Sequence, residues 1–124
     1  MKQAAVIALG GAVGALGRYA VALPFGAWDP SRLPWATLLV NLVGCVAIGS
    51  IAASSAVGRG PWWLRPFLIT GILGGFTTFS ALALETGLLL DAGRTLVAAA
   101  YVAVTMVFGL IAVRLGMLLV RPAA

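Results

Sequence analysis

Four apolar stretches, each long enough to cross a lipid bilayer, constrain this chain more than any other feature of its sequence. They cover residues 4–25, 35–57, 64–90 and 96–120 of 124. About 20 apolar residues in a helix span a hydrocarbon core about 30 Å thick. Lipid offers no partners to backbone N–H and C=O groups, so such stretches must be helices that satisfy these groups internally. We therefore predict an all-α fold with a single four-helix membrane domain over residues 1–124.

The composition supports this prediction. Hydrophobic residues make up 62% of the chain and charged residues 9%, whereas a soluble domain carries about 25% charged residues. The segments between the stretches are too short to link a second domain. The first stretch is similar to a secretory signal peptide, but three spans follow it, so we interpret it as a membrane helix. All four tryptophans lie in or next to the connecting segments, as in an aromatic belt: Trp28, Trp35, Trp62 and Trp63.

The basic residues are divided almost evenly between the two ends of the predicted helices. With four spans, both termini lie on one side of the membrane. That side carries Lys2, Arg59, Arg65, Arg114 and Arg121. The other side carries Arg18, Arg32 and Arg94. A split of 5 to 3 orients a chain only weakly, which suggests insertion both ways up and an antiparallel homodimer as a hypothesis. The net charge of +5 is scattered singly near helix ends, so it indicates the membrane surface as partner and not nucleic acid.

Several kinds of chemistry are excluded. The sequence contains no histidine, and Cys45 is its one cysteine. An intrachain disulfide, a His/Cys metal site and a His-based catalytic triad are therefore ruled out. The three carboxylates are scattered and offer no evident acid/base pair, so we expect no enzyme. Cys45 is interpreted as a small core residue.

Polar side chains inside a membrane span are costly, so each needs a reason. Thr37, Asn41 and Cys45 are spaced by four and share one face of the second predicted helix. Tyr101 and Thr105 are also four apart, in the fourth. One explanation is that such residues join helices across surfaces of small residues. Two surfaces of that kind are Gly10-x-x-x-Gly14 and Gly71-x-x-x-Gly75.

The third predicted helix carries a stronger signal. Residues 70–80 read Thr-Gly-Ile-Leu-Gly-Gly-Phe-Thr-Thr-Phe-Ser. Glycine costs about 1 kcal/mol in a helix interior, and Thr and Ser divert backbone hydrogen bonds. We therefore predict a helix interrupted in mid-membrane at Gly74–Thr78. Such interruptions are tolerated where they line a cavity or bind an ion, and a small cation would satisfy the freed carbonyls.

Groups beside this interruption suit an anion. Aromatic ring edges carry partial positive charge, and Phe79 directly follows the interruption. Hydrogen-bond donors that could replace the water of a small anion are Asn41, Ser80, Tyr101 and Thr105. Arg18, near a helix end, either draws anions toward the mouth or merely snorkels. Glu85 has three candidate roles: a proton-linked carboxylate, a salt-bridge partner or a vestibule residue.

Three segments together resemble the signatures of the Fluc, or CrcB-type, fluoride channels of microbes. They are Gly-Gly-Ala-Val-Gly-Ala-Leu-Gly-Arg-Tyr at 10–19, Thr-Leu-Leu-Val-Asn-Leu-Val-Gly at 37–44 and Gly-Ile-Leu-Gly-Gly-Phe-Thr-Thr-Phe-Ser at 71–80. The resemblance covers essentially the whole chain. It implies a multi-pass protein of the microbial plasma or inner membrane, assembled as a dual-topology antiparallel homodimer with two pores. Such a channel exports fluoride passively from the cytoplasm and relieves fluoride toxicity.

The resemblance also implies roles for individual residues. A structural sodium ion at the dimer centre would be held by the backbone carbonyls of Gly74 and Thr77. The pore's asparagine falls on Asn41, and the first of its two phenylalanines falls on Phe79. The pore's hydroxyl positions fall on Thr37, Ser80, Tyr101 and Thr105. The vestibule arginine falls on Arg18, and the carboxylate after the interruption falls on Glu85.

One departure from the family pattern leaves the assembly open. After Phe79 the family runs Ser-Thr-Phe, whereas this chain has Ser80-Ala81-Leu82. Leu82 thus stands where the second pore phenylalanine would be, and Ala81 removes a hydroxyl. Either the pore tolerates an aliphatic group here, or a heterodimer with a paralogous subunit supplies what is missing.

Two other functions remain as alternatives. A small dual-topology, proton-coupled exporter of the multidrug type has this size and weak charge bias. It would be expected to carry a glutamate in its first helix, and residues 4–25 contain no carboxylate. A non-conducting assembly subunit would explain the glycines but not the polar run at 77–80.

Overall fold

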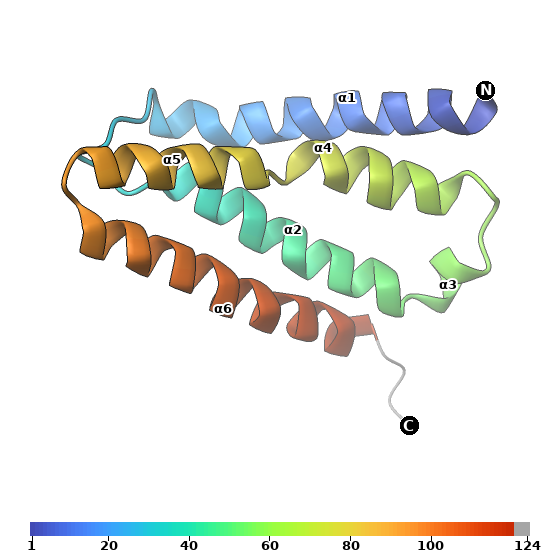
Figure 1. Ribbon diagram of the computed structural model, residues 1–124. Helices are drawn as coiled ribbons and strands as arrows, with labels where there is room; N and C mark the ends of the chain where they lie inside the picture. The colour runs from blue at the N-terminus through green and yellow to red at the C-terminus, as the bar shows by residue number, and fades with distance from the viewer. Residues whose placement is uncertain (121–124) are drawn as a thin grey trace.

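The computed structural model describes residues 1–120, so Arg121 lies outside the described residues. Four helical segments are long and apolar enough to cross a membrane: Lys2–Phe25, Trp35–Ala53, Pro66–Asp91 and Thr95–Val120. Figure 1 shows them running lengthwise beside one another, with the start of the first and the end of the last at the same end of the bundle. This confirms the predicted all-α fold with four apolar spans.

The first and last helices lie close to their predicted bounds. Helix α1 (Lys2–Ala22) continues into a short 3-10 turn, η1 (Leu23–Phe25). Helix α6 covers Thr95–Val120. The turn before α6 depends on Gly93, whose φ of +74° is a conformation that residues with a side chain rarely adopt.

The second helix ends earlier than predicted. Helix α2 covers Trp35–Ala53, whereas the apolar stretch runs to residue 57. Ser54 has an extended backbone (ψ 113°), and its side chain accepts a hydrogen bond from the amide of Val57. Serine is a preferred N-cap, so it ends α2 and starts the short helix α3 (Ser55–Gly58).

The third span contains several local structures. It begins as a π-helix, η2 (Pro66–Leu73), and continues as one α-helical turn, α4 (Gly74–Phe76). Thr77 and Thr78 then have extended backbones, with ψ of 158° and 121°. Helix α5 covers Phe79–Asp91 and is capped by the Thr78 side chain, which accepts from the amide of Ala81 at 3.2 Å.

The extended residues are therefore the two threonines. Gly74 and Gly75, which the sequence places within the interruption, are helical. Close packing explains one of these glycines, because a Cβ on Gly75 would lie 2.4 Å from the carbonyl oxygen of Gly11 in α1. Gly75 thus allows α1 and α4 to approach each other closely. The regular helical hydrogen bonds are lost at Thr77 and Thr78 instead.

Two seams of glycine hold the helices together. Along the first, α1 packs on η2 and α4, and a Cβ on Gly14 would lie 2.0 Å from the carbonyl oxygen of Ile72. Along the second, α2 packs on α6. A Cβ on Gly49 or Gly116 would lie 2.1 Å from a backbone oxygen of the opposite helix. Such contacts let helices approach closely without a hydrophobic driving force in lipid.

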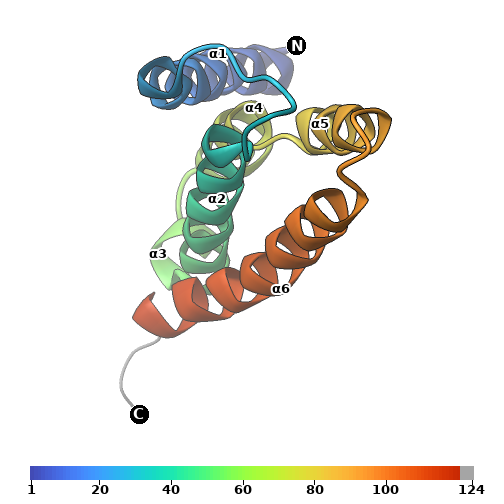
Figure 2. The same cartoon turned by 90° about the vertical axis from the view of Figure 1, so that its left-hand side faces the viewer.

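Helix α5 leaves this arrangement after the extended residues. It packs mainly on α6, and Figure 2 shows it turned away from α4, above the first turns of α6. A small core forms between these two helices from Leu82, Leu89, Ala98 and Tyr101. The third span therefore contacts α1 with its first half and α6 with its second, and a groove opens between the halves.

Candidate functional site

Asn41 on α2 holds the extended segment in place. Its side-chain nitrogen donates to the carbonyl oxygen of Thr78 at 3.1 Å, and its side-chain oxygen accepts from the amide of Thr78 at 2.9 Å. One amide side chain thus satisfies both backbone polar groups of a residue that lies outside any helix. Because Asn41 has two N–H donors, one of them is not used by Thr78.

The same arrangement leaves two carbonyls without their usual helical partners. In a continuous helix the amide of Thr78 would donate to Gly74, and the amide of Ala81 would donate to Thr77. Here these amides donate to Asn41 and to the Thr78 side chain. No described residue donates to the carbonyls of Gly74 and Thr77. Gly74 is also exposed on the outside of the subunit.

A partly open, mostly apolar groove of about 430 Å³ lies beside the extended residues. Four of the predicted pore residues line it, together with both carbonyl residues of the predicted cation site: Asn41, Phe79, Leu82, Thr105, Gly74 and Thr77. Helices α2, α4, α5 and α6 all contribute. Residues spread over more than 60 positions of sequence therefore meet at one groove.

The two positions of the aromatic pair differ sharply in their surroundings. Phe79 is 75% exposed, whereas Leu82 is 4% exposed and belongs to the core between α5 and α6. Phe79 thus projects from the rim of the groove. Leu82 forms part of its wall and is held by its neighbours.

Glu85 is the centre of a second polar cluster. Its carboxylate accepts from the hydroxyl of Thr37 at 2.6 Å and from the hydroxyl of Tyr101 at 2.7 Å. The three residues come from α5, α2 and α6. Within residues 1–120 the carboxylate has no basic side chain within 4.0 Å. Of the roles that the sequence left open for Glu85, a salt bridge is absent among these residues.

These contacts change how many donors are available to an anion. The hydroxyl protons of Thr37 and Tyr101 point to Glu85, and Thr105 donates to the carbonyl of Tyr101 at 2.8 Å. Ser80 is exposed and lies 3.2 Å from the hydroxyl of Thr78. In this conformation Asn41 and Ser80 are the better donors. The sequence gives the positions of these hydroxyls but not their partners.

A family model described as CrcB-like protein, Camphor Resistance (CrcB), matches residues 5–117. The chain belongs to the CrcB-like family. The chain is 40% identical over 124 residues to a protein of Rhodospirillum centenum named "Fluoride-specific ion channel FluC", covering 99% of this chain and 98% of that one. A protein of Paracoccus denitrificans with the same name is 48% identical over 111 residues, 90% of this chain and 88% of that one. The resemblance inferred from the three motifs is therefore confirmed.

Membership also settles the broad class of this CrcB-like protein. The family and the four apolar spans make it a multi-pass membrane protein. Its relatives are named ion channels, so it is not an enzyme. The matched region contains all three motifs and both polar clusters.

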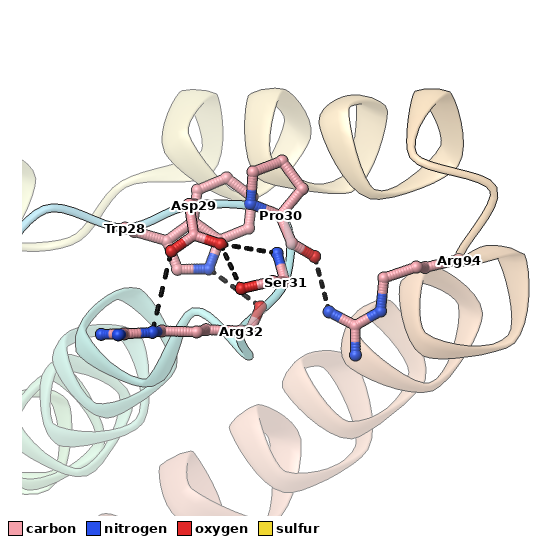
Figure 3. Close-up of polar contacts among 6 residues, drawn as sticks. All are labelled: Trp28, Asp29, Pro30, Ser31, Arg32 and Arg94. Atoms are coloured by element: carbon pink, nitrogen blue, oxygen red, sulfur yellow. Dashed lines mark hydrogen bonds and ion pairs between the residues drawn. The ribbon is translucent and has the colours of Figure 1, made fainter.

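Polar contacts hold the loop between α1 and α2 of this CrcB-like chain in a defined conformation (Figure 3). Asp29 accepts from the amide of Ser31 at 2.8 Å and from its hydroxyl, and lies 3.7 Å from the Nε of Arg32. These contacts lower the pKa of the Asp29 carboxyl, and the hydrogen bond from the Ser31 hydroxyl has the largest effect. The carboxylate is therefore ionised at neutral pH. Arg94, at the start of α6, donates to the carbonyl of Pro30 at 2.5 Å.

A cavity of about 450 Å³ lies against this loop. Its charged lining residues are Arg32, Arg94 and Glu85. The sequence gives no local sign of this cavity, because Arg32 and Arg94 are 62 positions apart and meet only when the loop packs near the start of α6. Arg18, the arginine singled out from sequence, is half-buried on α1 and does not line this cavity.

Proposed function

We propose that this chain is a fluoride-selective channel that lets fluoride leave the cytoplasm passively and so relieves fluoride toxicity. The observation that carries the proposal is the pairing of Asn41 with Thr78 beside the groove. This pairing fixes an extended segment in a membrane-spanning helix and presents an amide donor and an aromatic ring to the same space. The relatives named as fluoride-specific channels support the choice of anion.

The functional unit that we propose is an antiparallel, dual-topology homodimer. Two features of the single chain support a second copy: Phe79 is 75% exposed at the rim of a groove, and Gly74 is an exposed residue to whose carbonyl no described residue donates. A copy packed against this face would cover both. The 5 to 3 split of basic residues between the two ends orients the chain only weakly, so it opposes insertion both ways up less than a strong bias would. A heterodimer with a paralogous subunit is the alternative, because Leu82 and Ala81 depart from the family pattern.

The chemistry of the groove suits a small, strongly hydrated anion. Conduction requires that protein groups replace water without trapping the ion. The spare N–H of Asn41, the hydroxyl of Ser80 and the ring edge of Phe79 provide partial positive charge without a full one. At the Glu85 cluster, the hydroxyls of Thr37 and Tyr101 donate to the Glu85 carboxylate. An anion that passes there would have to compete with this carboxylate for the two hydroxyl donors.

The carbonyl oxygens of Gly74 and Thr77 fit a structural sodium ion. Both have lost their helical donors, and hard cations prefer oxygen ligands. In an antiparallel dimer each subunit would contribute these oxygens to one central site. A bound sodium ion would supply the positive charge that satisfies them. The chain's own contribution is the Asn41–Thr78 pairing, which keeps the two carbonyls unpartnered.

Efflux from liposomes tests this proposal. Purified protein would be reconstituted into vesicles loaded with potassium fluoride or potassium chloride, and efflux would be started with a potassium carrier and followed with an ion electrode. We expect rapid fluoride release, little chloride release and no need for a proton gradient. Absence of fluoride release would refute the homodimeric channel, and release that needs a proton gradient would favour the multidrug-type exporter.

A further inference from the structure

We propose that the loop 54–65, which joins α2 to the third span, is a binding surface for the headgroups of anionic phospholipids. Two arginines, Arg59 and Arg65, and two tryptophans, Trp62 and Trp63, form this surface, and all four are exposed. None of them lines the groove described above. The loop lies at the same end of the bundle as the start of α1 and the last turns of α6 (Figure 1). We call this the basic end.

The net charge of the chain is confined to the basic end. Five basic residues and no aspartate or glutamate belong to this end: Lys2, Arg59, Arg65, Arg114 and Arg121. At the opposite end, three arginines are equalled in number by the three acidic side chains of the chain: Arg18, Arg32 and Arg94 against Asp29, Glu85 and Asp91. The positive-inside rule counts basic residues alone, whereas attraction of anionic lipid depends on charges of both signs. By that measure the two ends differ by the whole formal charge of +5.

The described cations of the basic end are not neutralised by carboxylates. Among residues 1–120 the ion pair present joins Arg32 to Asp29, at the opposite end. Arg59 donates from Nη2 to the hydroxyl of Ser55 at 3.0 Å, a contact that orients its side chain and leaves its charge intact. A guanidinium has five N–H donors and can bind phosphate oxygens through two parallel hydrogen bonds. The phosphate of a lipid headgroup therefore fits the donors that remain.

The conformation of the loop sets the depth of these arginines in the membrane. The amide of Leu64 donates to the carbonyl of Pro61 at 3.0 Å, and this turn has Trp62 and Trp63 at its corner. Their side chains are 59% and 41% exposed. The Trp63 ring also packs edge-on against Phe67, with ring centroids 6.3 Å apart, which ties the loop to the start of the third span. Tryptophan prefers the headgroup level of a bilayer, so the flanking arginines lie at the level of the lipid phosphates.

The alternative is that the loop only anchors the helices at the interface, whatever the charge of the lipid. The tryptophans allow a test within one molecule. Trp28→Phe with Trp35→Phe leaves Trp62 and Trp63 as reporters of the basic end, and the converse pair of substitutions leaves reporters of the opposite end. Each full-length variant would be reconstituted into vesicles of phosphatidylglycerol and phosphatidylcholine in equal parts. In paired samples, one lipid or the other carries brominated acyl chains, which quench nearby tryptophan.

We expect brominated phosphatidylglycerol to quench the tryptophans of the basic end about threefold more strongly than brominated phosphatidylcholine, because basic residues at the surface attract anionic lipid. The tryptophans of the opposite end should be quenched equally by the two lipids. At about 1 M salt, where the Debye length is about 3 Å, the preference should shrink. Both leaflets contain the same lipids, so the result is the same for either orientation of the chain.

Substitutions then assign the preference to the two arginines. Arg59→Gln with Arg65→Gln should abolish it, whereas Arg59→Lys with Arg65→Lys should retain most of it, because the charges remain. The matched control is Arg18→Gln with Arg32→Gln, which removes the same charge from the opposite end and should leave the preference unchanged.

Three results would overturn this inference. The first is equal quenching by the two brominated lipids at the basic end, which identifies an interfacial anchor alone. The second is a preference that survives in the double glutamine variant. The third is a preference lost in the double lysine variant as well, because that identifies a change in the structure of the loop. The measurements use no fluoride, so they decide the lipid surface whether or not the chain passes fluoride in liposomes.

Discussion

Asn41 and Thr78 are separated by 37 residues, yet the side-chain amide of one takes both the N–H and the C=O of the other. This pairing explains why the third span can leave the helical conformation without stranding polar groups. It also explains which carbonyls lose their partners, because the Thr78 amide no longer donates to Gly74. A single side chain on α2 therefore shapes both the groove and the candidate cation site.

Removing the Asn41 amide should abolish conduction and destabilise the fold. Asn41→Ala breaks two part-buried hydrogen bonds, and each unmet group costs about 1–3 kcal/mol. We expect fluoride efflux to fall at least tenfold (about 1.4 kcal/mol), together with a lower unfolding temperature in detergent. Cys45→Ser is the matched control, because Cys45 lines the same groove one turn further along α2 and has no such pairing. Equal efflux from both variants would contradict the assigned role.

Sodium should stabilise the protein if Gly74 and Thr77 hold it. Ligands that bind only the folded state raise stability by mass action, by about 2.7 kcal/mol at a hundredfold excess over Kd. We expect a higher unfolding temperature in sodium than in N-methylglucamine buffers of equal ionic strength. The sodium effect should shrink in Asn41→Ala, whose extended segment is no longer fixed. An unfolding temperature indifferent to sodium in the unmodified protein would argue against the site.

Much of this molecule could be predicted from its sequence. Helix number and approximate bounds follow from apolar length. The extended Thr77 and Thr78 lie within the predicted interruption at Gly74–Thr78, whereas its glycines are helical. What the sequence could not supply is pairing across the bundle. Nothing local shows that Thr37 and Tyr101 both donate to Glu85, or that Gly75 packs closely against α1. The sequence also did not predict that α2 ends before Ser54, because a serine that caps a helix within an apolar run is hard to tell from one that the helix tolerates.

The Glu85 cluster should be energetically coupled. Tyr101→Phe removes one hydroxyl donor from the carboxylate, and a hydrogen bond to a charged group contributes about 1.5–3 kcal/mol. In a double-mutant cycle with Glu85→Gln, we expect a coupling energy of about 1 kcal/mol in the free energy of unfolding. Tyr19→Phe provides the control, since Tyr19 is 63% exposed and should be uncoupled. A coupling energy near zero for Tyr101 would show that the contact is not a functional unit.

The glycine seam between α1 and the third span should tolerate no added methyl group. A Cβ on Gly14 would lie 2.0 Å from the carbonyl oxygen of Ile72, so the two backbones must separate. We expect Gly14→Ala to cost about 3 kcal/mol of stability, the upper end for overpacking. Gly11→Ala is a close control on the same helix, because nothing lies within 4 Å of a Cβ there. Thermal unfolding in detergent should separate the two variants, and similar unfolding temperatures would contradict this account of the seam.

Leu82 is one of the two positions, with Ala81, where this chain differs from the pattern that the resemblance implies, and its surroundings favour a gain of function on substitution. The side chain is 4% exposed and packs in the core of α5 and α6, but it also borders the groove of about 430 Å³. A phenylalanine there can extend into the groove and present a second ring edge beside Phe79. We expect Leu82→Phe to raise fluoride efflux from liposomes at a stability cost below about 3 kcal/mol. Leu89→Phe, in the same core with 0% exposure and no contact with the groove, should destabilise the protein without raising efflux. An unchanged rate in Leu82→Phe would mean that the pore tolerates an aliphatic side chain here, which would remove the main reason to require a second, unlike subunit.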